Sequence, residues 1–103
     1  MEKLSMDELV QNIEQWAADK GINKKENSQA QMCKVMEEVG ETASALLKQD
    51  GEKLIDGIGD SFVTLIILAN QQGFTASDCL QIAWDVIKNR KGKTENGVFI
   101  KES

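Results

Sequence analysis

Apolar residues recur at helical spacing along most of this 103-residue chain, and the chain contains no proline. Leu9, Ile13 and Trp16 form the first of these apolar stripes. Such spacing places apolar side chains on one face of an α-helix, and without proline the helices are not interrupted. Hydrophobic residues make up 41% of the chain, as in ordinary globular proteins. One all-α domain covering residues 1–103 is therefore predicted.

Residues that typically begin or end helices divide the chain into four expected helices. Ser5 and Glu8 have the spacing of a capping box, as do Ser28 and Gln31, and Thr75 and Asp78 have a similar spacing. Glycine is a natural residue just after a helix end, as at Gly21. The expected helices cover about residues 6–20, 28–49, 52–72 and, from position 75 or 77, up to 90–92. A tail over 93–103 contains a short extended piece at 97–100.

The second half of the third expected helix, Phe62 to Ala69, reads FVTLIILA and is apolar almost all round. A helix of this kind must be buried on every side. Four short helices cannot surround one of their own, so we expect a second subunit to cover it, in a homodimer or homotetramer. The apolar run is too short to span a bilayer, and the charged N-terminus does not resemble a signal peptide. These features predict a cytoplasmic protein without a membrane partner.

The composition also restricts the chemistry. The net charge of −5 argues against a partner such as DNA or RNA, whose phosphates attract basic surfaces. The absence of histidine excludes histidine-based catalysis and zinc sites that mix histidine with cysteine. Cys33 and Cys79 lie in apolar helical patterns, so we expect them to be free thiols in the core.

Two acidic clusters interrupt the apolar stripes. The first, EEVGE, contains Glu37, Glu38 and Glu41, and the second, DGIGD, contains Asp56 and Asp60. Spacings of three and four residues place the acids of each cluster on one helix face. The two helices are joined by a short turn and should pack antiparallel. Because the clusters lie at similar distances from that turn, they are expected to face each other.

Several carboxylates in one partly buried space repel each other, so they must bind protons or a cation. A site with oxygen ligands only suits Mg²⁺, with Mn²⁺ as a substitute. The alternative is that these acids are solvated helix faces paired with lysines. Gly40, Gly57 and Gly59 lie inside the same helices, where they make room for a ligand or allow close helix packing.

The acidic pattern resembles the signature of the MazG-like, all-α nucleoside triphosphate pyrophosphohydrolases, which is EExxE followed, after a dozen or more residues, by ExxD. The run from Glu37 to Glu41 matches EExxE in full, and Asp60 matches the final aspartate. The resemblance extends from the region of Trp16 to the NRKGK segment. Gly57 stands where the first acid of ExxD is expected. Either Asp56 replaces that acid, or the site has one ligand fewer.

The resemblance implies a four-helix MazG-like bundle that forms dimers or tetramers. It implies cleavage of a nucleoside triphosphate between the α- and β-phosphates, giving a nucleoside monophosphate and pyrophosphate. Glu38, Glu41 and Asp60 would be the principal Mg²⁺ ligands, and Glu37 or Asp56 would help to hold the metal or orient the attacking water. Glu37 and Glu38 are both candidates for accepting the proton of that water.

Cationic and aromatic residues near these positions are candidates for binding the substrate. Lys34 and Gln31 precede Glu38 by one and two turns. Trp16 would stack on a base, or else belongs to the core. Arg90 and Lys93 in the tail would close over the phosphates, from the same chain or from a neighbouring subunit, or else are solvated. Asn89 would hydrogen-bond a base or sugar.

The sequence thus predicts Mg²⁺-dependent hydrolysis of free nucleoside triphosphates, with removal of unwanted nucleotides as the role. Two alternatives stay open. One is a non-catalytic helical oligomer that binds nucleotide or metal as a sensor, which the glycine in place of an acid would permit. The other is an interaction module built on the apolar run of the third helix.

Overall fold

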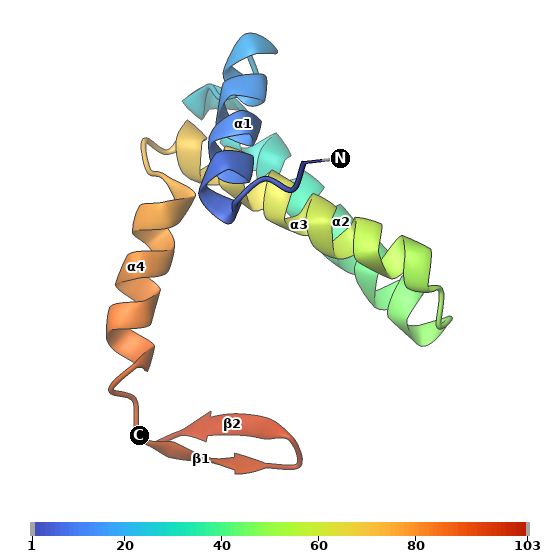
Figure 1. Cartoon of the computed structure of the whole chain (residues 1–103), viewed down its shortest axis with the longest axis vertical. Helices are drawn as coiled ribbons and strands as arrows, with labels where there is room; N and C mark the ends of the chain where they lie inside the picture. The colour runs from blue at the N-terminus through green and yellow to red at the C-terminus, as the bar shows by residue number, and fades with distance from the viewer. Residues whose placement is uncertain (1, 103) are drawn as a thin grey trace.

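The computed structural model describes residues 2–102 and consists mainly of four helices, with a small β-hairpin at the C-terminal end (Figure 1). The all-α prediction therefore holds for most of the chain. The elements in chain order are α1 Met6–Asp19, the 3₁₀ turn η1 Lys25–Asn27, α2 Ser28–Leu47, α3 Gly51–Gln71, α4 Ala76–Ile87, β1 Gly92–Glu95 and β2 Val98–Lys101.

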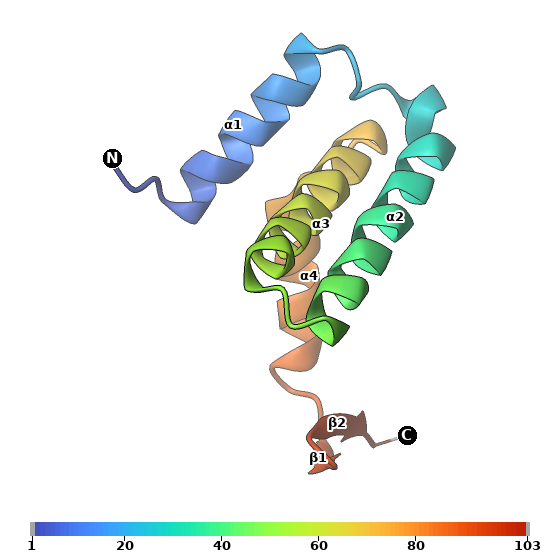
Figure 2. The same ribbon diagram turned by 90° about the vertical axis from the view of Figure 1, so that its right-hand side faces the viewer.

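Helices α2 and α3 form an antiparallel pair that is packed along its whole length (Figures 1 and 2). The tight turn between them includes Gln49 at a φ of +56°. The helices approach closely at Gly57, where an added Cβ would lie 3.1 Å from both the Cα and the Cβ of Thr42 and closer still to its Oγ1. By contrast, an added Cβ at Gly40 or Gly59 would meet no atom within 4 Å. Gly57 is thus a packing glycine, whereas the other two border open space.

Helix α1 lies along α3 on the side away from α2 (Figure 2). The buried apolar residues belong to these three helices and are Ala17, Val35, Ala45, Ile66 and Ile67. The side chain of Asn70 donates a hydrogen bond of 2.9 Å to Glu14 and so ties α3 to α1. The body of the molecule is therefore built around α3.

Helix α4 extends away from this body and carries the hairpin at its far end (Figure 1). The expected four-helix bundle would bury the apolar residues of α4, but they are exposed in the single chain; Leu80 and Ile82, for example, are 65% and 67% exposed. The apolar run on α3 is also incompletely covered, because Phe62 is 55% exposed and Leu65 47%. Three helices pack together, and among the described residues the fourth packs mainly against α3.

The helix ends agree with the sequence at two of three predicted caps. Ser5 and Glu8 form the expected capping box, and Thr75 accepts a hydrogen bond from the backbone N–H of Asp78. The predicted capping box at Ser28 is wrong, because η1 runs directly into α2 and residue 28 is already helical. The hydroxyl of Ser28 instead accepts a hydrogen bond of 2.7 Å from the side chain of Gln72.

The C-terminal tail forms a hairpin in which Glu95 pairs with Val98. Asn96 and Gly97, between the strands, have φ values of +51° and +77°. Two successive residues with positive φ are characteristic of the type I′ turn, for which Asn-Gly is the preferred sequence. The expected extended piece is therefore present in β2, but its pairing with residues 92–95 departs from a purely helical fold.

Two further predictions concern the cysteines and the apolar run on α3. Cys33 and Cys79 are free thiols as expected, but both are exposed rather than in the core. By length and composition alone, α3 is apolar enough to cross a membrane, a test that the core helix of a soluble protein also passes.

Candidate active site

The α2–α3 pair brings acids from both clusters to one place. Glu38 is buried at 8% exposure, and the charges of Glu41 and Asp60 both act on it. Two side-chain hydroxyls pin the helices beside it. Thr42 Oγ1 donates a hydrogen bond of 2.7 Å to the Glu38 carbonyl and lies 3.5 Å from Ser61 Oγ across the interface. The position of Glu38 is thus set by the closest part of the helix pair.

The surroundings of Glu38 disfavour its charge. Burial is the largest cause that raises the pKa of Glu38, and the nearby carboxylates of Glu41 and Asp60 raise it further. Lys34 lowers the pKa of Glu38 but offsets this rise only in part. Its Nζ lies 3.6 Å from Glu38 Oε1 and 3.5 Å from Glu37 Oε1. The pKa of Lys34 is raised in turn, mainly by Glu37. The cluster therefore carries more negative charge than its one close lysine offsets.

Two hollows meet at this cluster. The first, which we call the charged hollow, has a volume of about 450 Å³ and contains the acids Glu41, Asp56 and Asp60 together with Lys48 and Lys53. Gly57 also lines the charged hollow but has no side chain. The carboxylate next to it in the chain is that of Asp56, which lines the same hollow. The charged hollow combines acids that suit a metal ion with lysines that suit phosphates.

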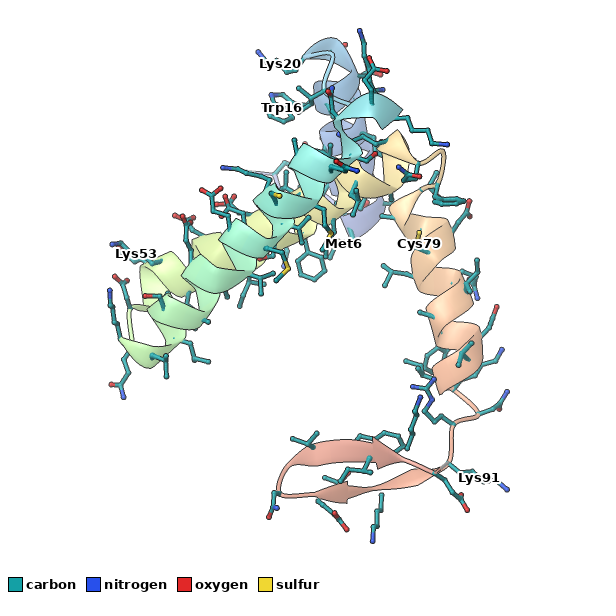
Figure 3. All side chains as sticks on the ribbon, turned by 180° about the vertical axis from the view of Figure 1, so that it is seen from behind. Met6, Trp16, Lys20, Lys53, Cys79 and Lys91 are labelled. Carbon is teal, nitrogen blue, oxygen red and sulfur yellow. The ribbon has the colours of Figure 1, made fainter. Side chains whose placement is uncertain are left out.

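The second hollow, which we call the mixed hollow, has a volume of about 550 Å³ and shares Asp60 with the first. Trp16, Gln31, Lys34 and Glu38 all line it. Trp16 is half exposed, so it is available to a ligand. In Figure 3, Trp16 and Lys53 lie toward opposite ends of the α2–α3 pair. The two hollows therefore form an elongated region with Asp60 common to both.

The structure does not bring the predicted tail residues to this region. Asn89, Arg90 and Lys93 lie beyond α4, at the end of the molecule away from the α2–α3 pair (Figure 1). Lys93 pairs with Glu95 in the hairpin at 2.8 Å. Within one chain, the expectation that the tail closes over the substrate is therefore not met. The reason is the outward direction of α4.

Lys48 and Lys53 line the charged hollow but were not predicted from the sequence. Lys48 follows Glu41 by seven residues, and Lys53 precedes Asp60 by seven. Seven residues are two helical turns, so each lysine lies on the same helix face as an acid of the cluster. That spacing was the available signal.

The carboxylates suit Mg²⁺ by their donor chemistry, since Mg²⁺ prefers oxygen ligands and Lys34 offsets the charge of the cluster only in part. In the described part of the chain, however, no three acidic or cysteine side chains converge closely enough to hold a metal ion. Glu41, Asp56 and Asp60 are exposed side chains on the rim of the charged hollow, so they are free to change rotamer. The donor set therefore fits Mg²⁺, and binding requires these side chains to turn inward.

Comparison with known proteins gives the class. The family model described as the MazG nucleotide pyrophosphohydrolase domain matches residues 26–94, which include α2, α3 and α4. Since this is more than half of the chain, the protein belongs to the MazG nucleotide pyrophosphohydrolase family.

Among curated proteins, the chain is similar to an uncharacterized 18.2 kDa protein encoded in the rep-hol intergenic region of Haemophilus phage HP1 (strain HP1c1). The two are 42% identical over 66 residues, which is 64% of this chain and 40% of the phage protein. The chain thus matches less than half of the length of that relative. No solved structure matches the chain.

Proposed function

We propose that this protein hydrolyses free nucleoside triphosphates, ribo- or deoxyribo-, between the α- and β-phosphates, releasing a nucleoside monophosphate and pyrophosphate in a reaction that depends on Mg²⁺. The observation that carries the proposal is the buried Glu38 beside Glu41 and Asp60, at the junction of two hollows with different linings. Family membership supports a nucleotide pyrophosphohydrolase. We place its role in the cytoplasm, as removal of unwanted nucleotides.

The linings of the hollows suggest how a nucleotide lies. The charged hollow offers Lys48 and Lys53 to the β- and γ-phosphates, and the mixed hollow offers Trp16 and apolar walls to the nucleoside. The α-phosphate then lies near Asp60, which both hollows share. This orientation brings the scissile bond to the acidic cluster.

Glu38, Glu41 and Asp60, with Asp56 as a fourth carboxylate, would hold Mg²⁺, for which Mn²⁺ is a possible substitute. When bound there, the metal would supply neutralisation of phosphate charge and a more acidic water. Glu37 and Glu38 are the candidates for accepting the proton of the attacking water. Lys34 lies within 3.6 Å of both carboxylates and would keep them oriented.

A second copy of the chain is proposed to cover the apolar face. Between α3 and α4 lies a hollow of about 430 Å³ that is lined almost wholly by apolar side chains, among them Phe62, Leu65 and Leu80. The exposed side of α4 continues this surface. Exposed apolar surface of this extent is typical of an interface. In a homodimer or homotetramer, the tail cations Arg90 and Lys93 would reach a site of the neighbouring subunit.

The test is pyrophosphate release from a panel of ribo- and deoxyribonucleoside triphosphates, with and without Mg²⁺. We expect Mg²⁺-dependent release that Glu38→Gln abolishes. Glu52→Gln is the matched control, because it makes the same chemical change on an exposed acid in the first turn of α3. Absence of release from every nucleotide would contradict the proposal.

Gly57 favours a second candidate function, a nucleotide-binding sensor, since it removes an acid that the family pattern contains. Tight nucleotide binding without any turnover would support the sensor. Turnover that Glu38→Gln abolishes would exclude it.

A further inference from the structure

Gln71, in the last turn of α3, has a buried amide oxygen without a hydrogen-bond partner among the described residues. The residue is only 3% exposed. It lines the mixed hollow together with Trp16 and Glu38. Buried polar atoms are rarely left unpaired in folded proteins, so each such atom calls for an explanation. A ligand in the mixed hollow would supply the missing partner.

The orientation of this amide is fixed by its other end. The Nε2 of Gln71 donates a hydrogen bond of 2.8 Å to the backbone carbonyl of Ile22. A carbonyl accepts but cannot donate, so the nitrogen must face Ile22 and the oxygen is the free atom. Gln31 is held in the same way, because its Nε2 donates to the carbonyl of Thr64 at 3.0 Å. Both glutamines therefore keep their oxygens as acceptors in the wall of one hollow.

The rest of the hollow suits a flat heterocycle. Ile22, Val63 and Ile67 supply apolar walls, and the half-exposed ring of Trp16 is available for stacking. An acceptor in such a wall complements a ring that carries an N–H donor. Adenine, cytosine and guanine carry an exocyclic amino group with two N–H donors. Uracil and thymine carry no amino group, and the one N–H donor on their base-pairing edge lies between two carbonyl oxygens, which would repel an acceptor in the wall.

We propose that Gln71 selects nucleotides whose base has an exocyclic amino group, by accepting a hydrogen bond from that group through Oε1. The inference rests on the proposed function, because it assumes that the mixed hollow receives the nucleoside. The oxygen is shielded from solvent in the free protein. A hydrogen bond from the base to this oxygen therefore requires the wall of the hollow to open around the ligand. Gln71 is a specificity residue and takes no part in phosphate cleavage.

The experiment compares nucleotides that differ only in the amino group. One pair is ATP and purine riboside triphosphate; the other is CTP and the 2-pyrimidinone riboside triphosphate. A site built to hydrogen-bond a group discriminates strongly against an analogue that lacks it. We expect kcat/KM to favour the amino member of at least one pair by about tenfold or more. In Gln71→Met, which keeps the volume but removes the acceptor, that ratio should fall to about one, mainly through KM.

Gln15→Met is the matched control. Gln15 is an exposed glutamine of α1 that bonds Asp19 at 2.8 Å, and its substitution should leave the ratio unchanged. The inference is overturned if the unaltered protein treats both members of each pair alike. It is equally overturned if Gln71→Met lowers turnover of both members by the same factor, which would mean that Gln71 only supports the fold. If Gln71→Met does not fold, the ratios of the unaltered protein decide.

A binding measurement separates this inference from the proposed function. Titration calorimetry with the monophosphates of the same two pairs, AMP against purine riboside monophosphate and CMP against 2-pyrimidinone riboside monophosphate, needs no hydrolysis. We expect the amino-bearing member of at least one pair to bind about tenfold more tightly or better. Equal affinities within both pairs, or no binding of any of the four, would overturn the inference. Failure to release pyrophosphate from any triphosphate would instead overturn the proposed function and leave the calorimetric result to stand by itself.

Discussion

Replacing Gly57 by alanine tests whether the close contact between α2 and α3 is as tight as described. The added Cβ would lie 3.1 Å from the Cα of Thr42 and closer to Oγ1. Thr42 cannot readily turn away, because its χ1 is restricted and its hydroxyl bonds the Glu38 carbonyl at 2.7 Å. The helices must therefore separate by a few tenths of an ångström.

The magnitude follows from two opposing effects. Overpacking in a well-packed interface costs about 1–3 kcal/mol. Replacing a glycine by alanine inside a helix contributes about 1 kcal/mol in the other direction. Gly59→Ala is the matched control, since its Cβ would meet no atom within 4 Å and only the favourable effect remains. The two variants should thus differ in free energy of unfolding by about 1–3 kcal/mol, with Gly57→Ala the less stable.

Urea unfolding at one fixed protein concentration measures this difference, since stability shifts the midpoint while the slope stays constant. Adding Thr42→Ala to Gly57→Ala removes the closest clashing atom and should restore part of the loss, by about 0.5 kcal/mol or more in a double-mutant cycle. Equal stability of Gly57→Ala and Gly59→Ala, within about 0.5 kcal/mol, would refute the reasoning. An acid placed at position 57 should be still more disruptive.

Three further predictions concern charge, metal and assembly. Without metal, the raised pKa of Glu38 means that its contribution to stability is greatest below the ordinary value of 4.5 and is lost as the pH rises through the raised pKa. Glu38→Gln should therefore raise the melting temperature at pH 7, whereas Glu37→Gln, at an exposed acid, should change it little. Mg²⁺ at about 100 times its dissociation constant should stabilise the fold by roughly 2.7 kcal/mol, and no shift in melting temperature would contradict metal binding. Leu65→Glu should convert the assembly to monomers in light scattering after gel filtration; an unchanged mass would show that this face is not the interface.

The sequence was sufficient for the helical pair and the meeting of its acids. The spacing of Glu38, Glu41 and Asp60, with a short turn between the helices, places them together without any knowledge of other elements. Local signals likewise identified the caps at Ser5 and Thr75. Such predictions succeed because each depends only on helix geometry over a few turns.

Predictions that depended on tertiary direction were less successful. The tail cations Arg90 and Lys93 were expected near the substrate, but the course of α4 depends on what it packs against, and one chain supplies little. Gly57 could be interpreted as space for a ligand or as close packing, and only its neighbour Thr42 decides for packing. The orphan oxygen of Gln71 depends on the backbone of Ile22, 49 residues earlier, and local spacing gives no sign of it.

Phosphorus NMR of a nucleoside triphosphate incubated with the protein and Mg²⁺ distinguishes the two possible cleavage positions. We expect signals of nucleoside monophosphate and pyrophosphate, absent with Glu38→Gln and retained with Glu52→Gln. Nucleoside diphosphate with inorganic phosphate, or unchanged turnover by Glu38→Gln, would contradict the proposed function.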